Sequence, residues 1–437
     1  MASTSLNHLL HTVADAGLEL FRRRAIGRAS PPQSMIELCC ALMSSLGDAS
    51  AVALARQIVE AYAALNEIEK RAFFGELRSR FHVDRDLILR CADEYRRLDD
   101  DESLSRLLSA AEPPRQELFR RINMAPDGTG MLVALREDLL RHVATAPELK
   151  PVDDDLSHLL SSWFNRGFLS LRRMDWDTPA SILEKVISYE SVHAIAGWSD
   201  LRGRLADDRR CYAFFHGALP DDPLIFVEVA LVDDLSDSVQ PLIDRRRPVI
   251  SADEATTAVF YSINNCHTGL RGISFGNFLI KQVILELTRE LPKLRTFATL
   301  SPIPMFRRWL STSLAAPDSD LVTGEQRDRL ERLDPQDWHQ SDAELKPLLL
   351  RLAARYLLEA KRGDYPHDPV ARFHLRNGAR LERINWRGDV SENGISQSAG
   401  ILVNYVYDVR TIEMNHEDHV THCKIAASPL VKRLARD

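Results

Sequence analysis

The first 165 or so residues show apolar positions spaced three and four apart along almost their whole length. This spacing places the apolar side chains on one face of a helix. Short polar or proline-containing breaks separate the periodic segments, as is typical of antiparallel neighbours in a bundle. The pattern predicts helices at 34–43, 49–66, 68–81, 84–98, 103–111, 114–121, 130–145 and 156–171.

The pattern changes after residue 210, where short runs of β-branched and aromatic residues predict strands. The runs at 211–215 and 224–231 flank a loop rich in proline and aspartate, which indicates a hairpin. A third strand, a glycine-rich loop, a helix and a fourth strand follow, at 257–263, 269–276, 276–290 and 295–300. The order β-β-β-loop-α-β therefore begins with an antiparallel meander.

The remainder is mostly helical until two closing strands. A long amphipathic helix is expected at 343–360, a short helix at 371–379 ending at Asn377-Gly378, strands at 381–386 and 400–407, and a helical tail from about 423. We therefore expect an α+β protein with two domains. Residues 1–170 form an all-helical packing or oligomerisation domain, and residues 171–437 form a mixed-sheet catalytic domain.

Composition narrows the class of protein. Of the 437 residues, 45% are hydrophobic and 27% charged, and the formal net charge is −7, so electrostatics give no reason to propose nucleic acid as a partner. No apolar run approaches the roughly 20 residues of a membrane span, so no membrane partner is expected. The six cysteines are scattered and form no CxxC pair, which favours a reducing, cytoplasmic location. Arginines at 22–24 suggest a transit peptide, but Asp15 and Glu19 nearby favour an ordinary helix end.

The glycine-rich loop indicates a phosphate site. Gly269, Gly272 and Gly276 precede a helix, whose N-terminus offers free N–H groups and a partial positive charge. The preceding antiparallel meander disfavours a Rossmann site, and a P-loop would need Gly-Lys-Ser/Thr. A pyrophosphate held by backbone amides remains, with Arg271 either the nearest cation or a simple surface charge.

Candidate reactive groups are few. Ser301 ends the fourth strand and is followed by Pro302 and Pro304. It lies outside a Gly-x-Ser-x-Gly elbow and fits a nucleophile, a hydrogen-bond donor or a turn residue. His374 is one of 14 histidines, and local sequence does not single it out. The histidines and acids at 415–422 are expected to form a polar loop rather than a zinc site.

Several separated motifs closely resemble the malonyl-CoA decarboxylase family, in the same order, from about 155 to 410. They are Arg210-Cys-Tyr-Ala-Phe-Phe-His216, Glu228-Val-Ala-Leu231, Gly269-Leu-Arg-Gly272, Phe278-Leu-Ile-Lys281, Leu300-Ser-Pro-Ile-Pro304, Phe373-His-Leu-x-Asn-Gly-Ala379, Arg383-Ile-Asn-Trp386 and Val403-Asn-Tyr405. The resemblance implies a helical domain followed by an acyltransferase-like (GNAT-like) domain. It further implies a homo-oligomer (dimer or tetramer) that takes part in fatty acid metabolism.

The resemblance also assigns roles to residues. The family's catalytic serine and histidine fall on Ser301 and His374. Its CoA-binding loop falls on Arg271, Gly272, Ile273, Ser274, Phe275, Gly276 and Asn277, although the three residues between Gly272 and Gly276 depart from the usual acyltransferase pattern. The reaction would convert malonyl-CoA to acetyl-CoA and CO2. Because the thioester is itself an electron sink, we expect neither a cofactor nor a metal.

In this scheme Ser301 holds the substrate carboxylate by a neutral hydrogen bond, and His374 protonates the resulting enolate. Backbone N–H groups of the strand at 257–263, or the side chains of Asn264 and Asn265, would hold the enolate oxygen. Two alternatives remain: a CoA-dependent N-acyltransferase of the same fold, and a non-catalytic CoA-binding sensor.

Overall fold

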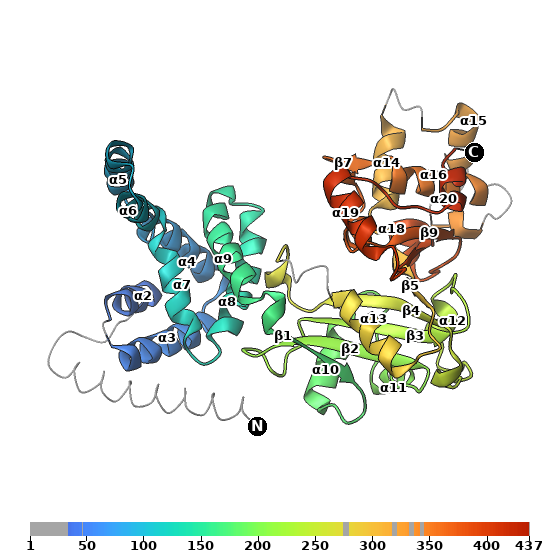
Figure 1. The fold of residues 1–437 in the computed structure, drawn as a ribbon, viewed down its shortest axis with the longest axis horizontal. Helices are drawn as coiled ribbons and strands as arrows, with labels where there is room; N and C mark the ends of the chain where they lie inside the picture. The colour runs from blue at the N-terminus through green and yellow to red at the C-terminus, as the bar shows by residue number, and fades with distance from the viewer. Residues whose placement is uncertain are drawn as a thin grey trace. The chain divides into compact units, whose positions relative to one another are not determined.

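The computed structural model describes residues 34–45, 47–273, 279–316, 321–331, 336–340 and 345–436. Contacts within the chain define two compact units (Figure 1). The first contains the described residues of Met1–Ser170 together with Phe215–Leu224 and Cys266–Phe275; the second contains those of Leu171–Phe214, Ile225–Asn265 and Gly276–Asp437. None of the helices in these ranges is long and apolar enough to cross a membrane.

The first unit is a bundle of helices, as the apolar spacing predicts. Its helices begin where polar side chains can accept the first backbone N–H groups: Asn66 accepts from Ile68 and Glu69, and Asp84 from Asp86 and Leu87. Their apolar faces meet in one core that includes Phe74, Phe119 and Leu135. The elements are α2 (Met35–Ser44), α3 (Asp48–Ala63), α4 (Glu67–Arg80), α5 (Arg85–Leu98), α6 (Asp101–Ala111), α7 (Pro114–Asn123), α8 (Gly128–Val143), η1 (Pro147–Leu149), α9 (Lys150–Trp163) and η2 (Arg166–Phe168).

The helix predicted at 156–171 is wrong at its C-terminal end. Helix α9 stops at Trp163, and the Asn165 side chain accepts from the N–H of Gly167, which turns the chain. Residues Leu169–Met174 then form strand β1. The Asn-x-Gly turn outweighs the apolar spacing that continues through this stretch.

The described residues of the second unit include an eight-stranded mixed sheet in the order β1-β2-β3-β4-β5-β10-β6, with β9 paired to β10. Strands β2, β3 and β4 are antiparallel, and β4 and β5 are parallel, so the predicted strand order is confirmed. The strands are β1 (Leu169–Met174), β2 (Arg209–His216), β3 (Ile225–Val232), β4 (Thr257–Asn265), β5 (Thr296–Thr299), β6 (Ser301–Pro302), β9 (Arg380–Asn385) and β10 (Leu402–Val406); β7 (Lys361–Arg362) and β8 (Tyr365–Pro366) form a separate pair.

Helix α13 runs across strands β2–β4 in Figure 1, with Val283, Ile284 and Leu287 among its buried residues. Its described part begins at Leu279, so the predicted start at 276 lies outside the described residues. The remaining helices of this unit are α10 (Ala180–Tyr189), α11 (Trp198–Arg204), α12 (Gln240–Ile243), α13 (Leu279–Glu290), α14 (Phe306–Ala315), α15 (Gly324–Glu331), α16 (Lys346–Leu358), α17 (Pro369–Arg376), α18 (Glu392–Ser398), α19 (Ile412–His422) and α20 (Pro429–Leu434), with 3₁₀ turns η3 (Ala252–Glu254), η4 (Thr268–Leu270) in the loop assigned to the first unit, and η5 (Trp338–Gln340).

The polar stretch at 415–422 is helical, which corrects the expectation of a loop. It lies in α19, where His419 hydrogen-bonds the carbonyl of Lys424 through Nδ1. Across the described ranges, no group of three or more histidine, cysteine, aspartate or glutamate side chains is placed to hold a metal ion.

Candidate active site

A cavity of about 310 Å³ opens in the second unit where strands β4 and β5 part. The two strands are in parallel register only from Thr257 opposite Thr296 to Phe260 opposite Thr299. Beyond that point β4 continues to Asn265, whereas the segment that follows β5 no longer pairs with β4. The gap between them is lined by Phe260, Tyr261, Ile263 and Asn265 on one side and by Leu300, Ser301 and Pro302 on the other. Its size lies at the small end of ligand pockets in proteins.

Ser301 lies at this divergence because the chain changes its pairing partner there, from strand β4 to strand β10. Its neighbour Leu300 still donates its N–H to the carbonyl of Phe260. Ser301 itself is paired with Val403 of β10 in the short strand β6. The serine is thereby fixed at the edge of the cavity, only 5% exposed. The predicted position of Ser301 at a strand end is confirmed.

His374 reaches the same cavity from helix α17. Asp368 caps this helix by accepting from the N–H groups of Val370 and Ala371, and Tyr356 donates to the same carboxyl group. Burial raises the pKa of Asp368, which lies in the protein interior. At the other end Asn377 caps the helix and Gly378 adopts a φ of +84°, as the Asn-Gly pair predicts. The short helix therefore has a fixed position, and His374 is 2% exposed.

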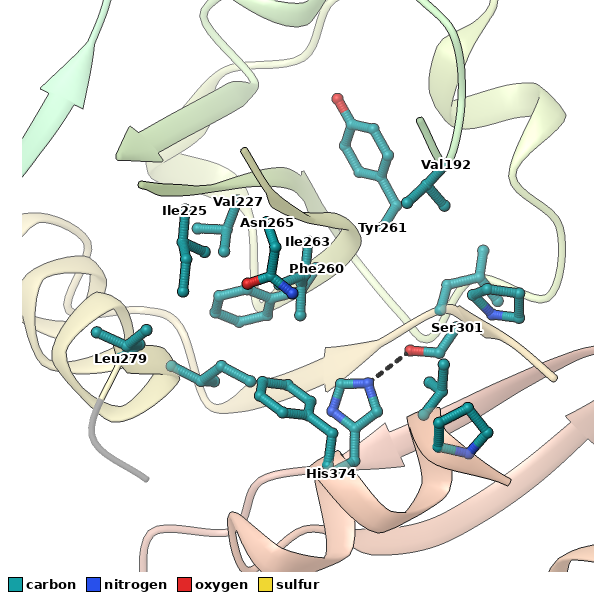
Figure 2. A pocket seen from close by; sticks show the side chains of 16 residues that line it. Val192, Ile225, Val227, Phe260, Tyr261, Ile263, Asn265, Leu279, Ser301 and His374 are labelled. Carbon is teal, nitrogen blue, oxygen red and sulfur yellow. Dashed lines mark hydrogen bonds between the residues drawn. The ribbon is translucent and has the colours of Figure 1, made fainter. Parts of the chain in front are cut away.

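The two predicted catalytic residues meet although 73 residues separate them in the chain (Figure 2). Nε2 of His374 lies 3.0 Å from Oγ of Ser301. The Ser301 hydroxyl donates to Oγ1 of Thr299 at 2.8 Å, and Nδ1 of His374 lies 2.7 Å from the hydroxyl of Tyr407. With Tyr407 donating to Nδ1, the imidazole proton sits on Nε2 and points to Ser301. The four side chains form one hydrogen-bonded chain.

Burial sets the charge state of these four hydrogen-bonded side chains. It lowers the pKa of His374 from 6.5 to about 3, so the free imidazole is neutral at neutral pH. Burial also raises the pKa of Tyr407 well above its ordinary range, which keeps its hydroxyl protonated. The ring of Tyr405 stacks on the imidazole with centroids 4.6 Å apart. Without a ligand the centre is therefore uncharged.

The rest of the lining is apolar. Val192, Ile225, Val227, Leu279, Ile280, Pro369, Val370 and Phe373 complete the wall, and no lysine, arginine, aspartate or glutamate is found among the described residues that line the cavity. A charged group that enters this cavity therefore meets hydroxyl, imidazole and amide groups and no fixed counter-ion.

The two asparagines at the end of β4 have different surroundings. The amide of Asn264 donates to Glu190 and to Ser262, and its oxygen accepts from Ser191, so this side chain is engaged away from the cavity. Asn265 lines the cavity, and its amide points into it in Figure 2. Of the two asparagines considered from sequence, only Asn265 is placed to contact a ligand there.

Only part of the predicted CoA loop lies within the described residues. Arg271 and Gly272 are exposed and Ile273 is buried, while Ser274, Phe275, Gly276 and Asn277 lie outside the described residues. The N–H of Arg271 donates to Thr268 and that of Ile273 to Leu270, so these two amides are used within the loop. Gly272 has a φ of +81°, a conformation that glycine adopts without strain. The exposed Arg271 side chain is then a candidate for contacting a phosphate.

Three residues of the centre were missed from sequence: Thr299, Tyr405 and Tyr407. All three show the two-residue spacing of a strand, either to a marked residue or to one another. Thr299 precedes Ser301 by two, and Tyr405 and Tyr407 are two apart on a predicted closing strand. Such residues lie on one face of a strand, so the alternation is a signal that could have found them.

The fold and this centre define an α+β protein class with a mixed sheet and a neutral Ser–His pair in a largely apolar cavity. Comparison with known proteins agrees. A family model for the malonyl-CoA decarboxylase C-terminal domain matches residues 167–437, and one for the N-terminal domain of that family matches residues 81–164.

Relatives extend this match over nearly the whole chain. The chain is 34% identical to the rat protein named "Malonyl-CoA decarboxylase, mitochondrial", over 93% of this chain and 89% of the relative. Crystal structures of malonyl-CoA decarboxylase from Rhodopseudomonas palustris and Agrobacterium vitis align with TM-scores of 0.88 and 0.86, at 51% and 49% identity. Each alignment covers 92% of this chain, and 100% and 99% of those chains respectively. The chain belongs to the malonyl-CoA decarboxylase family.

Proposed function

We propose that this protein is a carboxy-lyase that converts malonyl-CoA to acetyl-CoA and CO2. Beyond family membership, the observation that carries the proposal is the cavity. It holds a Ser301–His374 pair, is otherwise largely apolar, and has no fixed charge among its described lining residues.

The missing counter-ion favours decarboxylation over mere binding. A carboxylate in an apolar cavity is poorly solvated, and its loss as CO2 relieves that cost. A fixed arginine or lysine would stabilise the carboxylate in the ground state and thereby slow its departure. Ser301 instead offers one neutral hydroxyl, which turns from Thr299 to the substrate.

The chemical step breaks the bond between the carboxylate carbon and the α-carbon. Its electron pair moves into the thioester and gives an enolate, which then takes one proton at the α-carbon. Because the thioester accepts the electrons, the step needs neither a cofactor nor a metal. Full activity after dialysis against EDTA is the expected result, and loss of activity that Zn²⁺ or Mg²⁺ restores would overturn this part.

His374 supplies the proton as a general acid. The free imidazole is neutral, but the entering carboxylate changes its surroundings. A negative charge about 4 Å away contributes on the order of 4 kcal/mol at an effective dielectric constant of about 20. This attraction raises the pKa of His374 back toward its ordinary range, so the proton is taken up with the substrate. Tyr407 keeps the ring oriented by its hydrogen bond to Nδ1.

The enolate oxygen has two kinds of donor at the β4 wall. One is the amide of Asn265. The other is backbone: the pairing of β3 with β4 shifts between Glu228 and Val229, so Tyr261 is the extra residue of a bulge. Bulges leave backbone groups outside the strand ladder and recur beside active sites. Replacement of Asn265 by leucine distinguishes the side-chain donor from the backbone donor. If turnover is retained in this variant, the backbone holds the enolate oxygen.

The nucleotide end of CoA is assigned to the loop that follows β4. The residues that flank this loop on either side, Asn265 and Leu279, both line the cavity. Arg271 and Gly272 are exposed on the loop, and Arg271 supplies a positive charge for the pyrophosphate. Replacement of Arg271 by alanine is expected to raise KM for malonyl-CoA with little change in kcat.

The cellular setting stays a prediction of the sequence: a cytoplasmic homo-oligomer, dimer or tetramer. None of the six cysteines, all of them described, is in a disulfide bond, as a reducing compartment favours. Cell fractionation and light scattering on the purified chain test compartment and oligomeric state.

The deciding assay is incubation with malonyl-CoA alone. Release of CO2 and acetyl-CoA without any acceptor is the result expected for the decarboxylase. Product only after an amine is added would instead establish an N-acyltransferase, and binding without product would establish a sensor.

A further inference from the structure

The loop at 266–273 packs with the helices of the first unit rather than with the strands that flank it in sequence. Its short turn η4 lies against helix α8, and the approach is very close. A Cβ atom on Gly269 would lie 2.0 Å from the carbonyl oxygen of Val133. No side chain fits there, so glycine is required at this position for the contact itself.

A buried arginine of α8 fixes the same loop. Nη1 of Arg136 donates to the carbonyl of Gly269 at 2.7 Å and to that of Arg271 at 3.0 Å. Its Nε donates to Asp153 of α9 at 2.8 Å, and Arg136 and Asp153 are each 4% exposed. Lys150 also contacts Asp153, at 2.9 Å. The guanidinium thus joins two loop carbonyls to a carboxylate in the helical core.

These bonds orient the backbone on both sides of Leu270 and set the direction of Arg271. Hydrogen bonds from a charged donor are stronger than neutral ones, and a planar guanidinium holds several acceptors in fixed geometry. The carbonyl of Arg271 is turned toward Arg136, while its side chain is exposed. The exposed cation and Gly272 are therefore presented on a loop whose inner face is anchored.

We propose that Arg136, held by Asp153, is a positioning residue for CoA: it fixes the Gly269–Ile273 segment so that Arg271 meets the substrate pyrophosphate. The inference rests on the proposed function, since it assumes that this loop binds the nucleotide end of malonyl-CoA. It gives the helical unit a part in substrate affinity in addition to packing.

The chain offers a closely matched control. Arg115 of α7 pairs with Asp155 of the same helix α9, and it also donates to a backbone carbonyl, that of Phe81 at the end of α4. Arg115 and Asp155 are 4% and 9% exposed. This second pair resembles the first in chemistry and burial but has no bond to the loop. Disrupting either pair should lower the general stability of the protein. Only disruption of the Arg136–Asp153 pair should lower the affinity for CoA.

The experiment compares Arg136→Lys with Arg115→Lys, using two substrates. One is malonyl-CoA; the other is malonyl-pantetheine, which has the same thioester without the pyrophosphate and nucleotide. For Arg136→Lys we expect KM for malonyl-CoA to rise about tenfold, with kcat within about twofold and KM for malonyl-pantetheine unchanged, because one or two charge-assisted bonds are lost. Arg115→Lys should leave all of these values near wild type.

Equal KM values for the two arginine variants would overturn the proposal, and so would a rise in KM that is as large with malonyl-pantetheine. Measurements on the wild-type protein test the proposed decarboxylase function separately from the role of Arg136. Absence of turnover there refutes the decarboxylase, and equal KM for both substrates refutes the pyrophosphate site.

A second measurement holds even where a variant is too unstable for kinetics. The N–H groups of Arg271 and Ile273 are hydrogen-bonded within the loop. Their hydrogen exchange should be faster in Arg136→Gln than in Arg115→Gln, at a temperature where both are folded. Unchanged exchange at these two amides would overturn the positioning role.

Discussion

The two faces of strand β4 differ in charge. On one face, Ser262 and Asn264 point to a buried polar network in which Glu190 accepts from both. The ion pair between Arg204 and Glu228, at 2.9 Å, belongs to the same side of the sheet. On the other face, Ile263 and Asn265 line the cavity, where the described lining residues carry no fixed charge. Alternation along one strand separates the two environments.

The difference between the two faces of β4 shows where ionisable side chains are placed in this unit. The network secures the sheet with ionisable side chains that are buried and hydrogen-bonded to one another. The described lining residues of the cavity face carry no fixed charge, and under the proposed mechanism a cation beside the substrate carboxylate would oppose its loss. Tyr261 lies at the boundary: it lines the cavity, but its hydroxyl points away from Ser301 and His374 in Figure 2. The predictions below test this separation.

The largest effect is expected from the histidine on the cavity face. His374→Asn removes the proton donor, so kcat should fall about a hundredfold to ten-thousandfold while acetyl-CoA still binds. His193, a buried histidine on the polar side that lies 3.9 Å from Asp389, gives the control. His193→Asn should lower thermal stability and leave kcat nearly unchanged. Normal turnover in His374→Asn would exclude the proposed role.

A charge moved to the cavity face breaks the separation directly. Ile263→Arg places a permanent cation on the lining, which should stabilise the bound carboxylate and lower kcat about tenfold or more without raising KM. Ile263→Met, of similar size and neutral, should stay close to wild type. Steady-state kinetics on the two variants decide the matter, and equal kcat values would show that the uncharged wall is irrelevant.

The hydroxyl behind the histidine should have a smaller effect. Tyr407→Phe removes the donor to Nδ1 and leaves that nitrogen buried without a partner, so kcat should fall about tenfold with KM unchanged. Tyr405→Phe is the matched control. Its ring stacks on His374, but its hydroxyl has no hydrogen-bond partner among the described residues. If both variants lose the same activity, packing rather than orientation of the imidazole is responsible.

The smallest expected effect is on the pH dependence of the folding stability. Burial, with Glu190 nearby, raises the pKa of Glu228 from 4.5 to about 8, despite its pairing with Arg204. The folded state then binds more protons than the unfolded state between these values, so stability falls as pH rises from about 4.5 to 8. For His374 the sign is opposite: its pKa is lowered, so stability falls as pH falls from 6.5 to about 3.

Thermal unfolding between about pH 4 and 9 separates these two contributions. Glu228→Gln should flatten the alkaline side of the stability profile and leave the acid side. His374→Asn should do the reverse. A Glu228→Gln profile parallel to wild type would mean that this carboxylate stays ionised in the fold.

Most of the local structure could be predicted from sequence because it depends on neighbours in the chain. Apolar spacing predicted the helical half, and runs of β-branched and aromatic residues predicted the hairpin of β2 and β3. The Asn377-Gly378 pair gave the end of α17. The failures were also local: an Asn-x-Gly turn ended α9 early, and the polar residues of α19 belong to a helix that buries Ile412 and His419.

The sequence by itself determined the two-part architecture, the glycine loop and, through its motifs, the family. It also marked Ser301, whereas His374 was identified only through the resemblance. The tertiary structure decided what surrounds them. Tyr407 lies 33 residues from the histidine it orients, and Arg136 lies 133 residues from the carbonyl of Gly269. Contacts at such separations leave no periodic signal, since they arise only when strands diverge and helices pack.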